Sequence, residues 1–305
     1  MIDSLPMQPA IAPETTPTFT RRGFLRAAVR GGAGLSALSV SSLAWGASVE
    51  VDWVEIVPVE VILPRLPRAF DGFRIAQISD VHIEGGAMRR HFSDMARLTS
   101  EQGADAIVLT GDYTTYPDKW QEEALFEGFQ HLRAPSGVFA VLGNHDQWFP
   151  PGGGRGGAQV AREALARAGA RELRNDTFAI ERGGEKLWMC GLDDWGMGYS
   201  DLNTLLARLP APSCAILLAH EPDFADGAAP CGRFDLMLAG HSHGGQIALP
   251  FVGPVHLPGG ARKYPRGRYQ VGDMALYTNR GLGTTDVPIR FCSRPEITVF
   301  TLKSG

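Results

Sequence analysis

The central part of the chain alternates short apolar runs with polar loops that contain glycine. The first three runs cover residues 73–78, 104–109 and 137–142. Between the first two runs, apolar residues recur at steps of three and four from Met88 to Leu98, which is typical of one helix face. Strands that alternate with helices predict an α/β fold with mainly parallel strands and with functional loops at their carboxyl ends.

The second half of the chain continues this pattern less regularly. Further strands are predicted at 186–192, 215–220, 235–240, 268–272, 274–279 and 296–302. Apolar and polar residues alternate among prolines in 51–66, which predicts an edge strand or a hairpin. A helix is expected at 158–168, after a glycine-rich loop that we interpret as a linker rather than a lid.

The first fifty residues differ from the rest of the chain. The stretch TRRGFLR at 20–26 precedes a segment without charge, 31–49, and this arrangement resembles a twin-arginine export signal. We therefore expect residues 1–46 to be a leader for the twin-arginine export machinery and 47–305 to form one domain. The domain would act outside the cytoplasm, in the periplasm, or at the membrane if the leader is not cleaved. Glycine and serine make 31–49 a poor membrane span.

Charge and cysteine content narrow the functional classes. The chain of 305 residues has a formal net charge of −4 and no long basic run, which argues against a nucleic-acid scaffold. Its four cysteines are too widely spaced to predict a disulfide framework or a Cys-x-x-Cys pair. They are Cys190, Cys214, Cys231 and Cys292. A domain exported after folding completes its core in the reducing cytoplasm, which fits a metalloprotein.

Residues that can bind a metal follow five of the apolar runs. They are Asp80, His82, Asp112, Asn144, His145, Asp146, His220, His241 and His243. Residues two apart on an extended segment face the same side, so we expect Asp80 and His82 to share an ion. By the same spacing, His241 and His243 can also point at one ion. A set of imidazole, carboxylate and amide groups without thiolate suits manganese, iron, zinc or cobalt better than calcium or copper(I).

The order of these residues resembles that of the calcineurin-like metallophosphoesterases. The matching blocks are Asp80-Val81-His82, Gly111-Asp112, Gly143-Asn144-His145-Asp146, His220 and Gly240-His241-Ser242-His243. The resemblance implies a four-layer αββα sandwich with mixed sheets and a two-metal site at the carboxyl ends of the strands. It also implies two sets of metal ligands that share Asp112 as a bridge. These sets are Asp80, His82 and His243 for one metal, and Asn144, His220 and His241 for the other.

The resemblance also implies roles in catalysis. A P–O bond would be hydrolysed by in-line attack of a hydroxide that bridges two divalent ions, with manganese favoured over iron or zinc. His145 would protonate the leaving oxygen or bind the phosphoryl group, and Asp146 would hold the His145 ring in orientation. Of the two arginines near 281–288, we expect Arg280 rather than Arg290 to contact the phosphate.

Three functions remain open at this level. Thr115 stands where purple acid phosphatases have a tyrosine ligand, which excludes that branch. The twin-arginine signal and the segments around His220 and 239–250 resemble an exported phosphodiesterase branch, related to UDP-diacylglucosamine pyrophosphatases. We expect a phosphodiesterase acting on a small-molecule or lipid-linked phosphoester. The alternatives are a membrane-associated pyrophosphatase of the UDP-2,3-diacylglucosamine type and a non-catalytic metal-binding module of the envelope, associated with the membrane or cell wall.

Overall fold

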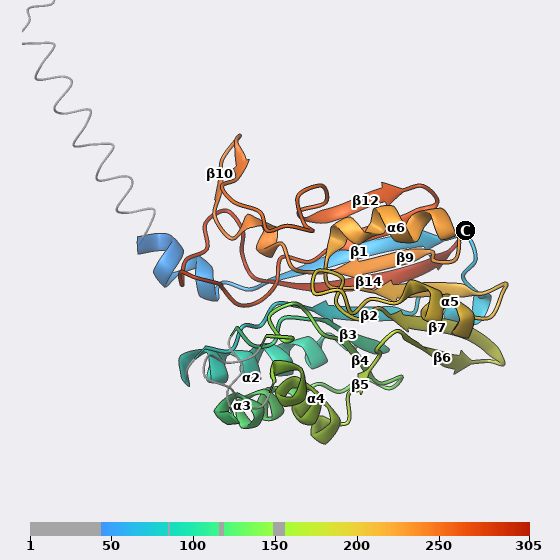
Figure 1. The fold of residues 1–305 in the computed structure, drawn as a ribbon, viewed down its shortest axis with the longest axis horizontal. Helices are drawn as coiled ribbons and strands as arrows, with labels where there is room; N and C mark the ends of the chain where they lie inside the picture. Colours follow the sequence, from blue (N-terminus) through green and yellow to red (C-terminus); the bar gives the residue numbers. More distant parts are fainter. Residues whose placement is uncertain (1–43, 85, 116–118, 149–155) are drawn as a thin grey trace, which may run out of the picture. The chain divides into compact units, whose positions relative to one another are not determined.

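A computed structural model describes residues 44–84, 86–115, 119–148 and 156–305 (Figure 1). The expected leader, 1–46, therefore lies almost wholly outside the described residues, and its boundary stays a prediction. Within the described ranges, no helix is both long enough and apolar enough to cross a membrane.

The first of two six-stranded sheets contains the strands predicted from the first half of the chain. In spatial order it comprises β1 (Glu55–Leu63), β14 (Glu296–Ser304), β2 (Arg74–Ile78), β3 (Ala106–Thr110), β4 (Val138–Val141) and β5 (Arg171–Glu172). Strands β2 to β5 are parallel, whereas β14 runs antiparallel to β2 and carries β1 at the edge of the sheet. The edge strand predicted within 51–66 is therefore confirmed.

The second sheet has the same number of strands and a parallel centre. Its order is β12 (Gly267–Val271), β13 (Met274–Thr278), β9 (Leu236–Ala239), β8 (Cys214–Leu218), β7 (Glu185–Gly191) and β6 (Asp176–Arg182). Only the outer strands β12 and β6 run antiparallel to their neighbours. A separate hairpin pairs β10 (Ala248–Leu249) with β11 (Gly253–Pro254).

Helices cover the outer faces of both sheets (Figure 1). The first sheet carries α2 (Gly86–Glu101), α3 (Lys119–Phe129) and α4 (Gly157–Ala168), and the second carries α5 (Leu202–Arg208) and α6 (Ala225–Ala228). Short 3₁₀ helices occur at η1 (Glu50–Asp52), η2 (Arg68–Phe70), η3 (Pro222–Phe224), η4 (Ala229–Cys231) and η5 (His243–Gly245). A third apolar cluster, with residues such as Val108 and Ile216, lies between the two sheets. The four-layer αββα sandwich is thus confirmed.

Candidate metal centre

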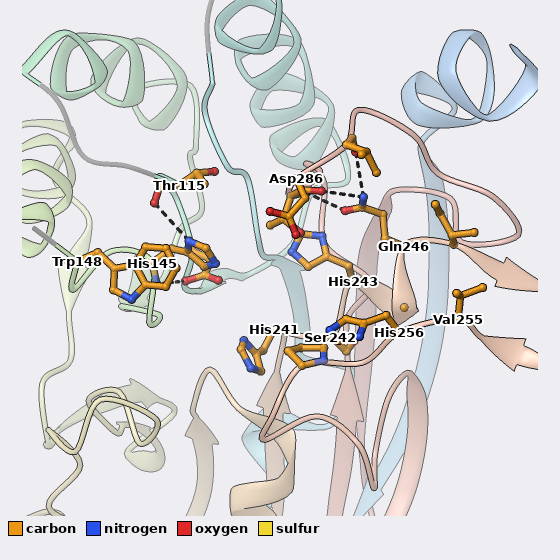
Figure 2. Close-up of a pocket in the computed structure, with 16 residues that line it drawn as sticks. Thr115, His145, Trp148, His241, Ser242, His243, Gln246, Val255, His256 and Asp286 are labelled. Atoms are coloured by element: carbon orange, nitrogen blue, oxygen red, sulfur yellow. Dashed lines mark hydrogen bonds between the residues drawn. The ribbon is translucent and has the colours of Figure 1, made fainter. Parts of the chain in front are cut away.

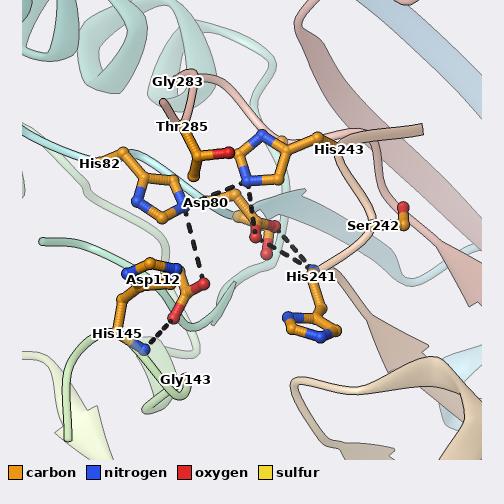
Figure 3. Close-up of polar contacts among 12 residues, drawn as sticks. Asp80, His82, Asp112, Gly143, His145, His241, Ser242, His243, Gly283 and Thr285 are labelled. Carbon is orange, nitrogen blue, oxygen red and sulfur yellow. Dashed lines mark hydrogen bonds and ion pairs between the residues drawn. The ribbon is translucent and has the colours of Figure 1, made fainter. Parts of the chain in front are cut away.

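The predicted ligands follow the carboxyl ends of strands from both sheets. Figure 3 shows Asp80, His82, Asp112, His241 and His243 converging there. Loops after β2, β3 and β4 in the first sheet carry Asp80, His82, Asp112 and Asn144. Loops after β8 and β9 in the second sheet carry His220, His241 and His243. Because both sheets end their parallel strands at the same edge, residues distant in sequence meet there.

Five of these residues have a left-handed backbone. Their φ angles are 50° at Asp80, 46° at His82, 56° at Asp112, 69° at His241 and 51° at His243. The expectation that extended segments aim the paired side chains at one ion was therefore wrong. Asp80 and His82 do lie in one cluster, but His241 and His243 lie in different clusters. This conformation costs a non-glycine residue roughly 1–2 kcal/mol, and such strain concentrates at functional sites.

Glycine is required where the loops touch one another. A Cβ on Gly240 would overlap the Ser79 hydroxyl and the Asp80 carboxylate. A Cβ on Gly143 would overlap the Asp112 carboxylate. Gly240 therefore allows loops of the two sheets to approach within contact distance, and Gly143 allows two loops of the first sheet to do so.

The side chains form two buried clusters. In the first, which contains Asp80, His82 and His243, the Nε2 atoms of the two histidines lie 3.1 Å apart, and His243 Nε2 lies 3.5 Å from Asp80 Oδ1. In the second, His220 Nε2 lies 3.0 Å from Asp112 Oδ2 and 3.1 Å from His241 Nδ1. The two clusters meet at Asp112, because its Oδ2 also lies 3.6 Å from His82 Nε2.

The protonation of the second cluster fits a cation. His220 Nδ1 lies 2.7 Å from the Thr110 carbonyl oxygen, and His241 Nε2 lies 2.8 Å from that of Gly259. A carbonyl oxygen only accepts hydrogen bonds, so these nitrogens carry protons. In the neutral rings, the opposite ring nitrogens then present lone pairs to each other. Two lone pairs facing each other repel unless a proton or metal ion lies between them. The arrangement therefore suits a metal ion.

A further donor points to the same conclusion. Asn144 Oδ1 is buried and has no hydrogen-bond partner among the described residues. A buried amide oxygen without a partner is destabilising, and coordination of a metal ion would satisfy it. Asn144 is the residue that the sequence assigned to the second metal, so its environment agrees with that prediction.

Burial and neighbouring charges shift the pKa values of the clustered groups. Burial lowers the pKa of His82 to about 3 and raises that of Asp80 to about 7. Burial alone would also lower the pKa of His220, but the adjacent Asp112 carboxylate raises it well above its usual value. The neutral His82 ring is in the form that binds metals, and an ion in the first cluster would keep Asp80 ionised.

A cleft of about 410 Å³ opens onto the clusters (Figure 2). Asp112, His241 and His243 lie at its base, and His145 and Trp148 form one wall, with their ring centroids 4.1 Å apart. The opposite wall combines apolar and polar side chains. It contains Ile247, Val255, Pro258 and Val287, together with Gln246, His256, Thr285 and Asp286.

His145 is fixed by backbone and side-chain contacts. Its backbone N–H donates to Asp112 Oδ1 over 2.9 Å, and its Nδ1 lies 3.3 Å from the Thr115 carbonyl oxygen. The Thr115 hydroxyl also lies 3.0 Å from His82 Nδ1. Thr115 therefore orients two rings of the site, a role that sequence reasoning missed because the residue was considered only as a replacement for tyrosine.

The expected contact between Asp146 and the His145 ring is not formed, and that prediction was wrong. The Asp146 carboxylate accepts hydrogen bonds from the backbone N–H groups of Asp112, Tyr113, Thr114 and Gly143, at 2.8 to 3.1 Å. These donors occupy both oxygens. Asp146 thus joins the loop after β3 to the loop after β4, and its effect on catalysis would be indirect.

Replacing Asp146 with Asn should destabilise the fold by about 3 kcal/mol, because an amide nitrogen would face backbone donors in a buried position. Urea unfolding with and without added metal measures the change. The ring of His145 keeps its contact with Thr115 in this variant. Unchanged stability with a large loss of activity would instead support the orienting role.

The structure does not support the expected phosphate contact of Arg280. Its guanidinium forms ion pairs with Glu296 and with Glu55, the latter at 2.8 Å, and it is not among the described residues that line the cleft. Arg290 is fully buried and donates to the carbonyl oxygens of Gly283 and Ser293. Both arginines therefore hold the segment 280–293 in place.

Comparisons with known proteins agree with this site. A family model described as calcineurin-like phosphoesterase matches residues 73–245. The chain is 39% identical over 241 residues to the metallophosphoesterase YkuE of Bacillus subtilis, covering 78% of this chain and 82% of YkuE. It is 31% identical over 231 residues to the phosphodiesterase YaeI of Escherichia coli, covering 75% of this chain and 82% of YaeI. It is 26% identical over 316 residues to the UDP-2,3-diacylglucosamine pyrophosphatase LpxG of Chlamydia trachomatis, covering 86% of this chain and 93% of LpxG. The chain belongs to the calcineurin-like phosphoesterases, a family of metal-dependent phosphoester hydrolases.

Proposed function

We propose that the chain is a phosphodiesterase that uses two divalent metal ions, manganese favoured over iron or zinc, for in-line hydrolysis of a P–O bond. The observation that carries this proposal is the position of Asp112, whose Oδ2 lies within 3.6 Å of a histidine nitrogen in each cluster. In-line displacement requires positive charge near both the entering and the leaving oxygen, and a shared carboxylate suits two neighbouring ions. The phosphodiesterase YaeI supports the choice of a diester.

The proposed ligand sets are those implied by the sequence. One ion would be held by Asp80, His82 and His243, and the other by Asn144, His220 and His241. Both ions would also contact Asp112. When bound, the two ions would lower the pKa of a water molecule and offset charge on the phosphoryl group. The imidazole, carboxylate and amide donors, without thiolate, support manganese, iron or zinc.

We assign His145 to proton transfer at the leaving oxygen. Its ring lines the cleft beside Asp112, and the Thr115 carbonyl oxygen fixes a proton on Nδ1. Nε2 is then the nitrogen that can exchange a proton with substrate. Trp148 packs against the ring and limits its rotation.

Replacing His145 with Ala tests this assignment. The backbone N–H that contacts Asp112 is retained, so metal content should not change. Hydrolysis of a diester with a poor leaving group, such as a phenyl ester, should fall by about 100- to 10,000-fold. Hydrolysis of bis-p-nitrophenyl phosphate should fall much less, because nitrophenolate leaves without protonation. Equal losses for both substrates would contradict the assignment to proton transfer.

A second candidate is a pyrophosphatase acting on a lipid-linked nucleotide sugar. The apolar side chains in one wall of the cleft, which include Ile247, Val255 and Val287, favour it, as does the similarity to LpxG. A panel containing a nucleotide-sugar lipid, phospholipids, cell-wall phosphodiesters and monoesters distinguishes the two functions. Turnover confined to the nucleotide-sugar lipid would replace the first proposal. Metal binding without turnover of any member would indicate a non-catalytic envelope module.

We also propose that the twin-arginine machinery exports the chain and that it works in the periplasm or at the membrane. Arg21 and Arg22, followed by Phe24 and Leu25 and then by the uncharged segment 31–49, support this proposal. Cell fractionation of the full chain in strains with and without that machinery tests it. Equal distribution in both strains would rule out this route.

A further inference from the structure

The hairpin β10–β11 exposes apolar side chains next to the cleft. Phe251 is fully exposed and Val252 is 78% exposed. We use the term apolar rim for five side chains that are each at least 43% exposed: Leu249, Phe251, Val252, Val255 and Val287. Soluble domains rarely leave such a group uncovered unless it contacts a partner or a membrane.

The apolar rim is held by fixed contacts at its base. Gln246 donates from Nε2 to the Thr285 and Val287 carbonyl oxygens, and its Oε1 accepts from the Thr285 N–H. Ile247 forms a bridge with Phe291, and the Ala248 N–H donates to the Phe291 carbonyl oxygen over 2.8 Å. These hydrogen bonds therefore fix the backbone that carries the exposed side chains.

The apolar rim continues into the cleft. Val255, labelled in Figure 2, and Val287 belong to both, and Ile247 lines the cleft just before the hairpin. From 247 to 260 the sequence contains no acidic or basic residue apart from His256. An apolar path thus connects the outer surface with the wall opposite His145.

The described chain begins near the base of the same hairpin. The Gly46 carbonyl oxygen accepts from the Arg290 N–H over 3.2 Å, and Arg290 precedes the residue that bridges to Ile247. Trp45 and Trp53 are about half exposed in this segment, which lies at the same end of the molecule as β10 (Figure 1). Residues 44–49, the described part of the uncharged sequence 31–49, therefore lie at the end of the domain that carries the apolar rim.

We propose that the apolar rim inserts into the interfacial region of a lipid bilayer and holds the mouth of the cleft against the membrane. A bilayer accepts aliphatic and aromatic side chains without matching polar groups, whereas a protein partner would need a polar border around the contact. Asp286, beside Val287, adds negative charge, so attachment should not require anionic lipid. The proposal rests on the proposed location at the membrane and not on the proposed catalytic activity, since it concerns where the site is held.

A tryptophan at position 251 reports on insertion directly. In the full chain, the additional emission of Phe251→Trp over wild type should shift to shorter wavelength with phosphatidylcholine vesicles and be quenched by brominated phosphatidylcholine. Ile62→Trp is the matched control, because Ile62 is 57% exposed at the opposite end of β1. Its emission should not change. Quenching is specific to position 251, so a leader that binds the vesicles by itself would not produce it.

Flotation with the same vesicles gives a second measurement. The double variant Phe251→Ser/Val252→Ser should partition about tenfold or more weakly than wild type, with unchanged turnover of a soluble diester. Added phosphatidylglycerol should not increase the binding. If brominated phosphatidylcholine does not quench the emission of the tryptophan at position 251, the proposal is overturned. If quenching is absent and the double variant also loses a concentration-dependent dimer that wild type forms, the apolar rim is a self-association surface.

Discussion

Replacing Asp112 with Asn should reduce kcat/KM for bis-p-nitrophenyl phosphate by about 1,000-fold or more, equivalent to at least about 4 kcal/mol of transition-state stabilisation. Asn keeps the size of the side chain and an oxygen that can accept the His145 N–H. It removes the charge that lies between the two clusters. Titration with Mn²⁺ should show weaker binding at both positions, since Oδ2 faces His82 and His220 together.

The stability of the metal-free variant separates this effect from unfolding. Charge on Asp112 contributes, after burial, to the raised pKa values of Asp80 and Asp146. Removing that charge relieves this repulsion but also takes from His220 the carboxylate that raises its pKa, so the melting temperature of the metal-free protein should change little. Asp235→Asn is the matched control, because Asp235 is a buried carboxylate at the other end of β9. It should lose stability and keep activity. Full activity in Asp112→Asn would refute the dinuclear mechanism.

The pattern of apolar runs was sufficient to predict an α/β fold and the loops that carry the clustered residues, whereas the four layers came from the family resemblance. The apolar runs that became β2, β3 and β4 are followed within a few residues by Asp80, Asp112 and Asn144, so a parallel sheet necessarily brings those loops together. The grouping of His243 with Asp80 and His82 came from the family resemblance, because periodicity alone does not show which loops of two different sheets face each other. Short elements such as β5 and α6 were missed because their runs are too brief for a periodic signal.

Local backbone geometry and polar contacts could not be predicted. Extended spacing correctly paired Asp80 with His82, but the left-handed φ angles show that turns aim these side chains. A carboxylate next to His145 suggested a partner for its ring, yet Asp146 instead binds backbone N–H groups from two loops. The ion pairs of Arg280 depend on Glu55, which is distant in sequence. Each of these features is determined by tertiary packing and carries no local sequence signal.

Each cluster combines ligands from both sheets, which links metal binding to the packing of the sandwich. Asp80 and His82 follow a strand of the first sheet, whereas His243 follows one of the second. In the other cluster, Asp112 comes from the first sheet, and His220 and His241 come from the second. Bound ions would therefore join loops whose charges and lone pairs otherwise repel each other, and metal should stabilise the folded chain.

His241→Ala and His243→Ala should therefore each empty mainly one of the two metal positions, although only one residue separates them in sequence. His241 contacts the ring of His220, and His243 contacts that of His82. Binding at the affected position should weaken by more than about 100-fold, beyond the usual effect of losing an outer partner of a ligand. Mass spectrometry of metal content, combined with electron paramagnetic resonance of the Mn²⁺ form, should show a coupled pair replaced by an isolated ion.

The two variants should give different isolated-ion spectra, because the remaining donors differ. His241→Ala retains the cluster with two imidazoles and the Asp80 carboxylate, whereas His243→Ala retains the one that includes the Asn144 amide. His256→Ala is the control, since His256 lines the same cleft outside both clusters and should leave both ions bound. Identical spectra, or loss of both ions in each variant, would mean that the positions fill as one unit. In that case Asp112, rather than the individual histidines, would determine occupancy, and activity should fall equally in both variants.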